Sequence, residues 1–158
     1  MIRMRRSFGV VAVLAALSGC IQSESSLRSN FYGDRAAFEE MLELFAQDDH
    51  LVRVANDFTR LKHDWSWPRE DVGLTPERWD RYRALFARAR LDGGIERQGT
   101  EVFFYMSSVG LVGSGRSRGV AFATSRPLET ARTLGERQGE GISYVALEGN
   151  WYLFDWSF

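Results

Sequence analysis

Residues 95–107 read IERQGTEVFFYMS, and they separate a helix-rich half of the chain from a strand-rich half. From this point apolar residues no longer recur at helical spacing, and short runs of β-branched and aromatic residues take over. The polar step Gln98-Gly99-Thr100 divides two such runs, Ile95–Gln98 and Glu101–Ser107. The segment therefore predicts a strand, a tight turn and a second strand.

Three more strands are predicted after this hairpin. Val120–Thr124 follows the glycine-rich stretch Gly110–Gly119, which we interpret as an irregular hairpin connection. Ser143–Leu147 and Trp151–Trp156 flank Gly149-Asn150, a typical two-residue hairpin turn. About five strands joined by short loops predict an antiparallel sheet.

Two amphipathic helices are predicted before the sheet. The first runs from Asp34 to about Asp48, and Thr75-Pro76-Glu77 starts the second with an N-cap, a proline and an acid. Their apolar stripes are Phe38, Met41, Leu42 and Phe45 in the first, and Trp79, Tyr82, Phe86 and Ala89 in the second. Between them, Leu51–Val54 favours extended structure. The expected fold is a single α+β domain over residues 34–158, with both helices packed on one face of the sheet.

The N-terminal residues have the layout of a secretory signal. Arg3, Arg5 and Arg6 precede the run Phe8–Leu17, in which every residue except Gly9 is apolar. This run is too short to cross a bilayer, which takes roughly 20 apolar residues.

The tetrapeptide Leu17-Ser18-Gly19-Cys20 follows the run and resembles the lipobox of bacterial lipoproteins. The resemblance covers residues 1–20. It implies that the Cys20 thiol is joined to a diacylglycerol, that residues 1–19 are removed as a signal peptide, and that a fatty acid such as palmitate caps the new amino group. It also implies a lipid-anchored protein of the cell envelope. Ile21, in place of an aspartate after the cysteine, favours the outer membrane, facing the periplasm.

The segment after the cysteine is polar. Residues 20–33 contain four serines and show no apolar periodicity. We interpret them as the lipidated cysteine followed by a flexible tether that lets the domain swing on the order of 20 Å from the membrane.

Composition limits the classes of partner. Residues 1–19 hold three arginines and no acid, so the chain from Cys20 onward has 17 basic and 21 acidic residues. This acidic excess argues against a nucleic-acid partner. Cys20 is the sole cysteine, so neither an intramolecular disulfide nor a cysteine-ligated metal is expected.

No motif for catalysis or for a cofactor is present. Gly110–Gly119 has no helix predicted after it and no Gly-Lys-Ser/Thr, so a phosphate-binding loop is less favoured than a hairpin connection. His50 and His63 lie thirteen positions apart and are expected to be independent surface residues. Neither a catalytic residue nor a metal or cofactor site is predicted.

Aromatic residues form the strongest remaining signal. Successive residues of a strand point to opposite faces, so the runs that contain Tyr152 and Phe154 place large rings on both sides of the sheet. These rings form either a two-sided core or a partner-binding surface. Candidate partner-binding residues are Tyr152, Phe154 and the loop residues Trp65 and Trp67.

Two functions are compatible with these patterns. The first is a non-enzymatic, membrane-anchored envelope lipoprotein whose domain binds a protein, a peptide or an envelope component. The alternative is a small envelope hydrolase, which requires His50 or His63 within hydrogen-bond reach of a carboxylate and a hydroxyl.

Overall fold

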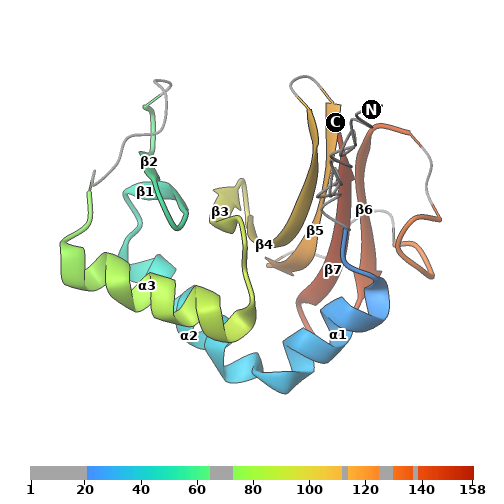
Figure 1. Cartoon of the computed structure of the whole chain (residues 1–158), viewed down its shortest axis with the longest axis horizontal. Helices are drawn as coiled ribbons and strands as arrows, with labels where there is room; N and C mark the ends of the chain where they lie inside the picture. The colour runs from blue at the N-terminus through green and yellow to red at the C-terminus, as the bar shows by residue number, and fades with distance from the viewer. Residues whose placement is uncertain (1–20, 65–72, 112–113, 125–129, 137–138) are drawn as a thin grey trace, which may run out of the picture.

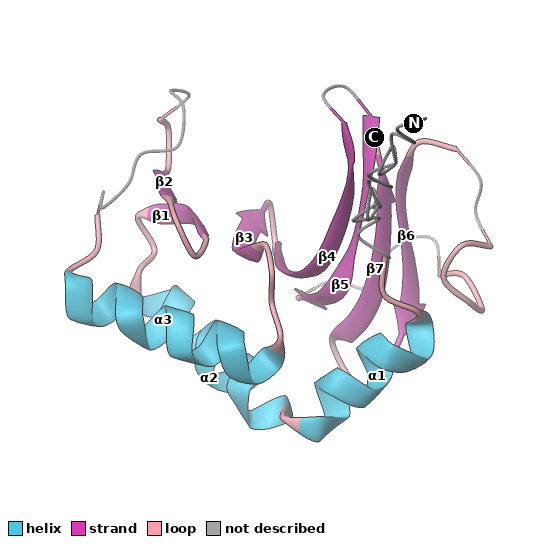
Figure 2. Cartoon of the chain, viewed as in Figure 1, coloured by secondary structure: helices cyan, strands magenta, loops and turns pink. Residues whose placement is uncertain are grey.

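The computed structural model describes residues 21–64, 73–111, 114–124, 130–136 and 139–158. Within these ranges the chain forms three helices and seven strands (Figures 1 and 2). They are α1 (Glu24–Gly33), α2 (Arg35–Gln47), β1 (Leu51–Val54), β2 (Thr59–Leu61), α3 (Pro76–Ala89), β3 (Gly94–Gln98), β4 (Glu101–Leu111), β5 (Ser114–Ala123), β6 (Gly141–Ala146) and β7 (Trp151–Ser157). The class is α+β, as predicted, but two helices and about five strands were too few. Cys20, Trp65 and Trp67 lie outside the described residues.

The strands form one antiparallel sheet in the order β2-β1-β3-β4-β5-β7-β6. The predicted hairpin of residues 95–107 is confirmed as β3 and the first part of β4, with Gln98 opposite Glu101. The β6–β7 hairpin is also confirmed, and its second strand lies beside β5. Figure 1 shows the helices along one side of the curved sheet, with the strands rising away from them.

The two predicted helices are confirmed as α2 and α3. The Asp34 carboxylate caps α2 by accepting from the main-chain nitrogen of Ala37 at 3.2 Å. The Thr75 hydroxyl caps α3 by accepting from the nitrogen of Arg78 at 3.3 Å. Most of the predicted stripe residues are buried, namely Phe38, Met41, Phe45, Trp79, Tyr82, Phe86 and Ala89. Their burial joins the helices to the sheet.

The predicted flexible tether is wrong from Glu24 onward, because this segment forms α1. The Ser23 side chain caps the helix, and Leu27 and Phe31 are completely buried. The ring of Phe31 lies 5.3 Å from that of Trp151 in β7. Two buried residues four positions apart are too few to reveal helical periodicity in the sequence. The helix is stabilised instead by the packing of these residues against partners in the distant sheet.

The glycine-rich stretch is also different from its prediction. Most of Gly110–Gly119 belongs to β4 and β5, which are paired along their length, and not to an irregular connection. A Cβ built on Gly119 would lie 1.9 Å from the main-chain oxygen of Phe104. Glycine is therefore required at this position by the close approach of two backbones.

The sheet has a core on each face. Val102, Phe104 and Met106 pack beneath the helices. Phe103 and Tyr105 point the other way and are equally buried. Of the two alternatives for the aromatic strands, the two-sided core is confirmed.

Candidate ligand-binding cavity

An aromatic cluster covers the face of the sheet opposite the helices. It consists of Phe103, Tyr105, Ala121, Ala123, Tyr144, Tyr152 and Phe154. Phe103 and Phe154 meet edge to face, with their ring centroids 5.1 Å apart. Tyr152 and Phe154, two of the candidate partner-binding residues, are 5% and 0% exposed. The structure thus places both inside the second core, where they are not free to contact a partner.

A cavity of about 480 Å³ lies against this cluster. It is lined by Arg53, Glu96, Tyr105, Ser108, Ser117, Trp156 and Phe158. Register explains why residues so far apart in sequence meet, since Arg53 pairs with Glu96, and Ser117 pairs with both Ser108 and Trp156. Paired residues of an antiparallel sheet share a face. The volume lies within the range of small-molecule sites, about 300–1,000 Å³.

The uncharged part of the cavity is aromatic with a small hydroxyl patch. The rings of Trp156 and Phe158 meet edge to face at 5.7 Å, and 53% of Phe158 is exposed. The hydroxyls of Ser108 and Ser117 are hydrogen-bonded to each other at 2.9 Å. A smaller cavity of about 220 Å³ shares Ser108 and Phe158 with it, so the groove continues along the ends of β4 and β5.

The opposite end of the cavity is charged. The buried carboxylate of Glu96 accepts from Arg53 Nη1 at 3.0 Å and from Arg60 Nη2 at 2.6 Å. The Arg53 guanidinium also lies 5.0 Å from the ring centroid of Tyr105 and 5.2 Å from that of Phe58. Arg53 and Glu96 thus line the cavity as an ion pair, and Arg60, which lies outside the lining, donates to the same carboxylate.

Tyr105 places a neutral hydroxyl next to these charges. Burial raises the pKa of Tyr105 above its ordinary value, and the neighbouring Glu96 carboxylate raises it further. Gln98 Nε2 donates to the tyrosine oxygen at 3.4 Å. The hydroxyl therefore remains protonated at physiological pH.

These groups suit binding better than catalysis. The two serine hydroxyls bond each other, and the Glu96 carboxylate is paired with two arginines. No histidine is among the described lining residues. Aromatic walls at one end and the Arg53 guanidinium at the other fit an amphipathic molecule with an apolar body and an anionic group.

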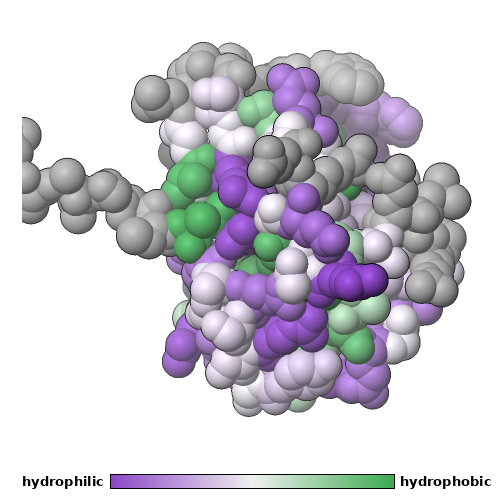
Figure 3. Space-filling model, turned by 90° about the vertical axis from the view of Figure 1, so that its right-hand side faces the viewer, coloured by the Kyte–Doolittle hydropathy of each residue, from purple (hydrophilic) through white to green (hydrophobic). Residues whose placement is uncertain are grey.

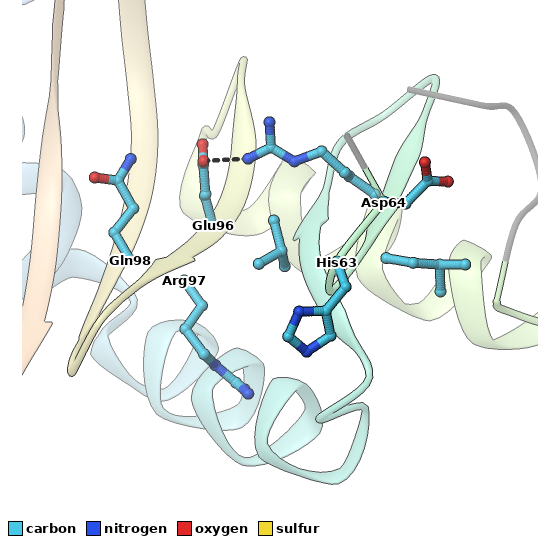
Figure 4. Close-up of a pocket in the computed structure, with 8 residues that line it drawn as sticks. His63, Asp64, Glu96, Arg97 and Gln98 are labelled. Carbon is cyan, nitrogen blue, oxygen red and sulfur yellow. Dashed lines mark hydrogen bonds and ion pairs between the residues drawn. The ribbon is translucent and has the colours of Figure 1, made fainter. Parts of the chain in front are cut away.

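The histidines do not form the site that a hydrolase requires. Both are exposed, and His50 Nε2 lies 2.8 Å from the main-chain oxygen of Gly73. His63 lines a separate cavity of about 240 Å³ with Asp64 and Glu96. In Figure 4 the His63 ring and the Asp64 carboxylate point in different directions, and Glu96 is paired with an arginine. Among the described residues neither histidine is hydrogen-bonded to a carboxylate or a hydroxyl.

Within the described ranges, no three histidine, cysteine or acidic side chains lie close enough to hold a metal ion. No helix in the described part of the chain is both long and apolar enough to cross a membrane.

Sequence reasoning missed most of the cavity. Trp156 and Phe158 follow Phe154 at steps of two, and this spacing places Trp156 on the face of Phe154 in a strand. Glu96, a charged residue inside a predicted strand, was a second available signal. The pairing of β1 with β3, which brings Arg53 to Glu96, has no local signature.

Comparison with known proteins does not identify the chain. Neither the family models, nor the curated proteins, nor the solved structures contain a match to it.

Proposed function

We propose that this chain is the precursor of a lipid-anchored protein of the bacterial envelope, and that its domain binds a small amphipathic ligand without converting it. The anchor is the acylated Cys20, and the expected location is the outer membrane, facing the periplasm. The ligand is an envelope component or a short peptide segment, and no cofactor takes part. The lipobox-like tetrapeptide after a short apolar run supports the location.

The cavity beside Trp156 is the observation that carries the binding proposal. It combines aromatic surface, two hydroxyls and the Arg53 guanidinium in about 480 Å³. Large aromatic groups exposed beside a few fixed polar groups are typical of ligand sites. The paired state of Ser108, Ser117 and Glu96 supports binding over catalysis.

Two fluorescent probes test this proposal on residues 21–158, which contain every described helix and strand. The probes are 8-anilinonaphthalene-1-sulfonate, which is anionic, and N-phenyl-1-naphthylamine, which is neutral. We expect one saturable site per chain for each probe. Ser108→Leu fills the cavity from an exposed position and should weaken both probes at least tenfold.

Charge at the cavity is tested separately. Arg53→Gln should weaken the anionic probe and leave the neutral one nearly unchanged, because Arg60 still neutralises Glu96. Tyr32→Ala is the matched control, since Tyr32 is 52% exposed on α1, outside the cavity. Equal affinity of both probes for the wild type and Ser108→Leu would exclude the cavity as the binding site.

A further inference from the structure

Gln22 is held on the domain through both its backbone and its side chain. Its main-chain nitrogen donates to Ser107 Oγ at 3.1 Å, and its main-chain oxygen accepts from Arg118 Nη1 at 3.0 Å. Its side-chain nitrogen donates to the main-chain oxygen of Met106 at 3.1 Å. Its side-chain oxygen accepts from Asn30 Nδ2 at 3.1 Å. Gln22 is therefore part of the folded domain, fixed to both α1 and the sheet.

A single residue, Ile21, separates Gln22 from Cys20. Two residues of extended chain span at most about 7 Å. If Cys20 is acylated, which is part of the function proposed above, its Cα lies within this distance of a fixed point on the domain, and only the cysteine side chain and the glycerol separate it from the ester-linked acyl chains. No tether is left that would let the domain move away from the membrane.

We propose that the domain docks directly on the lipid surface in one orientation, through the end of the sheet that carries Arg116 and Phe158. In Figure 1 the described chain ahead of α1 runs up beside β7, toward the end of the sheet where residue 158 lies. The same end holds Gly115, whose nitrogen donates to the main-chain oxygen of Phe158 at 2.7 Å. The described chain ahead of α1 thus runs toward these strand ends.

Side chains at this end suit a membrane interface. Phe158 and Tyr32 are the large hydrophobic residues exposed among those described, and Phe158 is the one at the anchor end. Trp156 is half-buried beside it, and Arg116 lies opposite Ser157 with 37% of its side chain exposed. Aromatic rings and arginines gather where proteins meet the headgroup layer.

The flank beside this end is largely hydrophilic. On the side of the molecule that carries β6 and the N-terminal end of α1, hydrophobic atoms form a few separate groups on a largely hydrophilic surface (Figure 3). This flank does not favour deep insertion of the domain into the acyl region.

Docking in this orientation also places the ligand cavity at the membrane surface. Ser107 and Arg118 hold Gln22, and their sequence neighbours Ser108 and Ser117 line the cavity on the opposite face of the sheet. The cavity therefore lies across the sheet from Gln22, so a ligand taken from the bilayer surface has a short path to it.

Neutron reflectometry tests the docking on the full acylated protein, purified from membranes and reconstituted in a supported phosphatidylethanolamine–phosphatidylglycerol bilayer. We expect the protein layer to begin at the headgroups without a water layer between them. The matched variant carries a twelve-residue Gly-Ser insertion between Ile21 and Gln22, which leaves every described contact of Gln22 in place. It should show a hydrated gap on the order of 20 Å.

The outcomes of this experiment distinguish failure of the membrane docking from failure of the lipid anchor. A wild-type layer with the same gap as the insertion variant would overturn the docking while leaving the lipid anchor intact. The mass of the purified chain is measured first, and a chain without acyl groups would overturn the anchor and the docking together.

Discussion

Arg118 and Gln22, 96 positions apart in sequence, are joined by a 3.0 Å hydrogen bond from the guanidinium to the main-chain oxygen. The same guanidinium donates to Asp155 in β7 through Nε at 2.9 Å and Nη2 at 2.8 Å. One partly buried arginine thus ties the segment next to the predicted acylation site to the middle of the sheet. Arg116 completes the group by donating to Asp155 from Nε at 2.6 Å.

Replacing Asp155 should destabilise the fold strongly. Asp155→Asn leaves Arg116 and Arg118 without a counter-charge, and Asp155 is only 4% exposed. Removing one partner of a buried ion pair costs on the order of 3 kcal/mol in the free energy of unfolding. Urea denaturation measures the loss. The control is Asp80→Asn, which removes an exposed pair with Arg83 and should change stability by less than about 1 kcal/mol.

The contribution of Asp155 should depend on pH in a defined direction. Burial by itself would raise the pKa of Asp155, but hydrogen bonds from Arg116 and Arg118 outweigh it and hold the pKa below the ordinary 3.8. A depressed pKa stabilises the fold above the unfolded value, and this stabilisation is lost as the pH falls through the folded value. The stability difference between the wild type and Asp155→Asn should be constant from about pH 7 to 5 and shrink below about pH 4. A difference that grew toward low pH would contradict this assignment.

Truncating Leu27 tests whether α1 belongs to the core. The side chain is completely buried, so Leu27→Ala should lower the free energy of unfolding by about 2–5 kcal/mol. Ser29→Ala, on the exposed side of the same helix, should have an effect within about 0.5 kcal/mol. Equal stability of the two variants would mean that the segment is a tether after all.

Loss of the Tyr82 hydroxyl should lower the free energy of unfolding by a measurable amount, smaller than the loss expected for Leu27→Ala. It donates to Asp48 Oδ2 at 2.8 Å inside the contact between α2 and α3, and Arg78 Nε donates to the same oxygen at 3.0 Å. Tyr82→Phe should cost about 1.5–3 kcal/mol because a hydrogen bond to a charged acceptor is lost in a buried place. Thermal unfolding measures it, with Tyr32→Phe at an exposed position as the control.

The elements that sequence reasoning predicted are those whose signals are local. Thr75-Pro76-Glu77 starts α3 with its own cap, and Gly149-Asn150 sets the β6–β7 turn without help from distant residues. The buried stripes of α2 and α3 follow from helical periodicity in the same way. In each case a few neighbouring residues are enough to determine the helix or the turn.

The elements that it missed depend on distant contacts. The sequence around α1 is polar, and its partners Trp151, Ser107 and Arg118 lie 85 or more positions away from the residues they hold. The cavity is assembled in the same way, because strand order and register bring Arg53 and Glu96 to the face of Trp156. Register is a property of the whole sheet, and no single strand encodes it.

Mass spectrometry of the N-terminal peptide tests the proposed lipid anchor. The protein is isolated from bacterial membranes and digested with a protease. We expect a peptide that begins at Cys20 and carries a diacylglycerol thioether together with an amide-linked fatty acid. A peptide that contains residues 1–19, or one with a free Cys20 thiol, would contradict it.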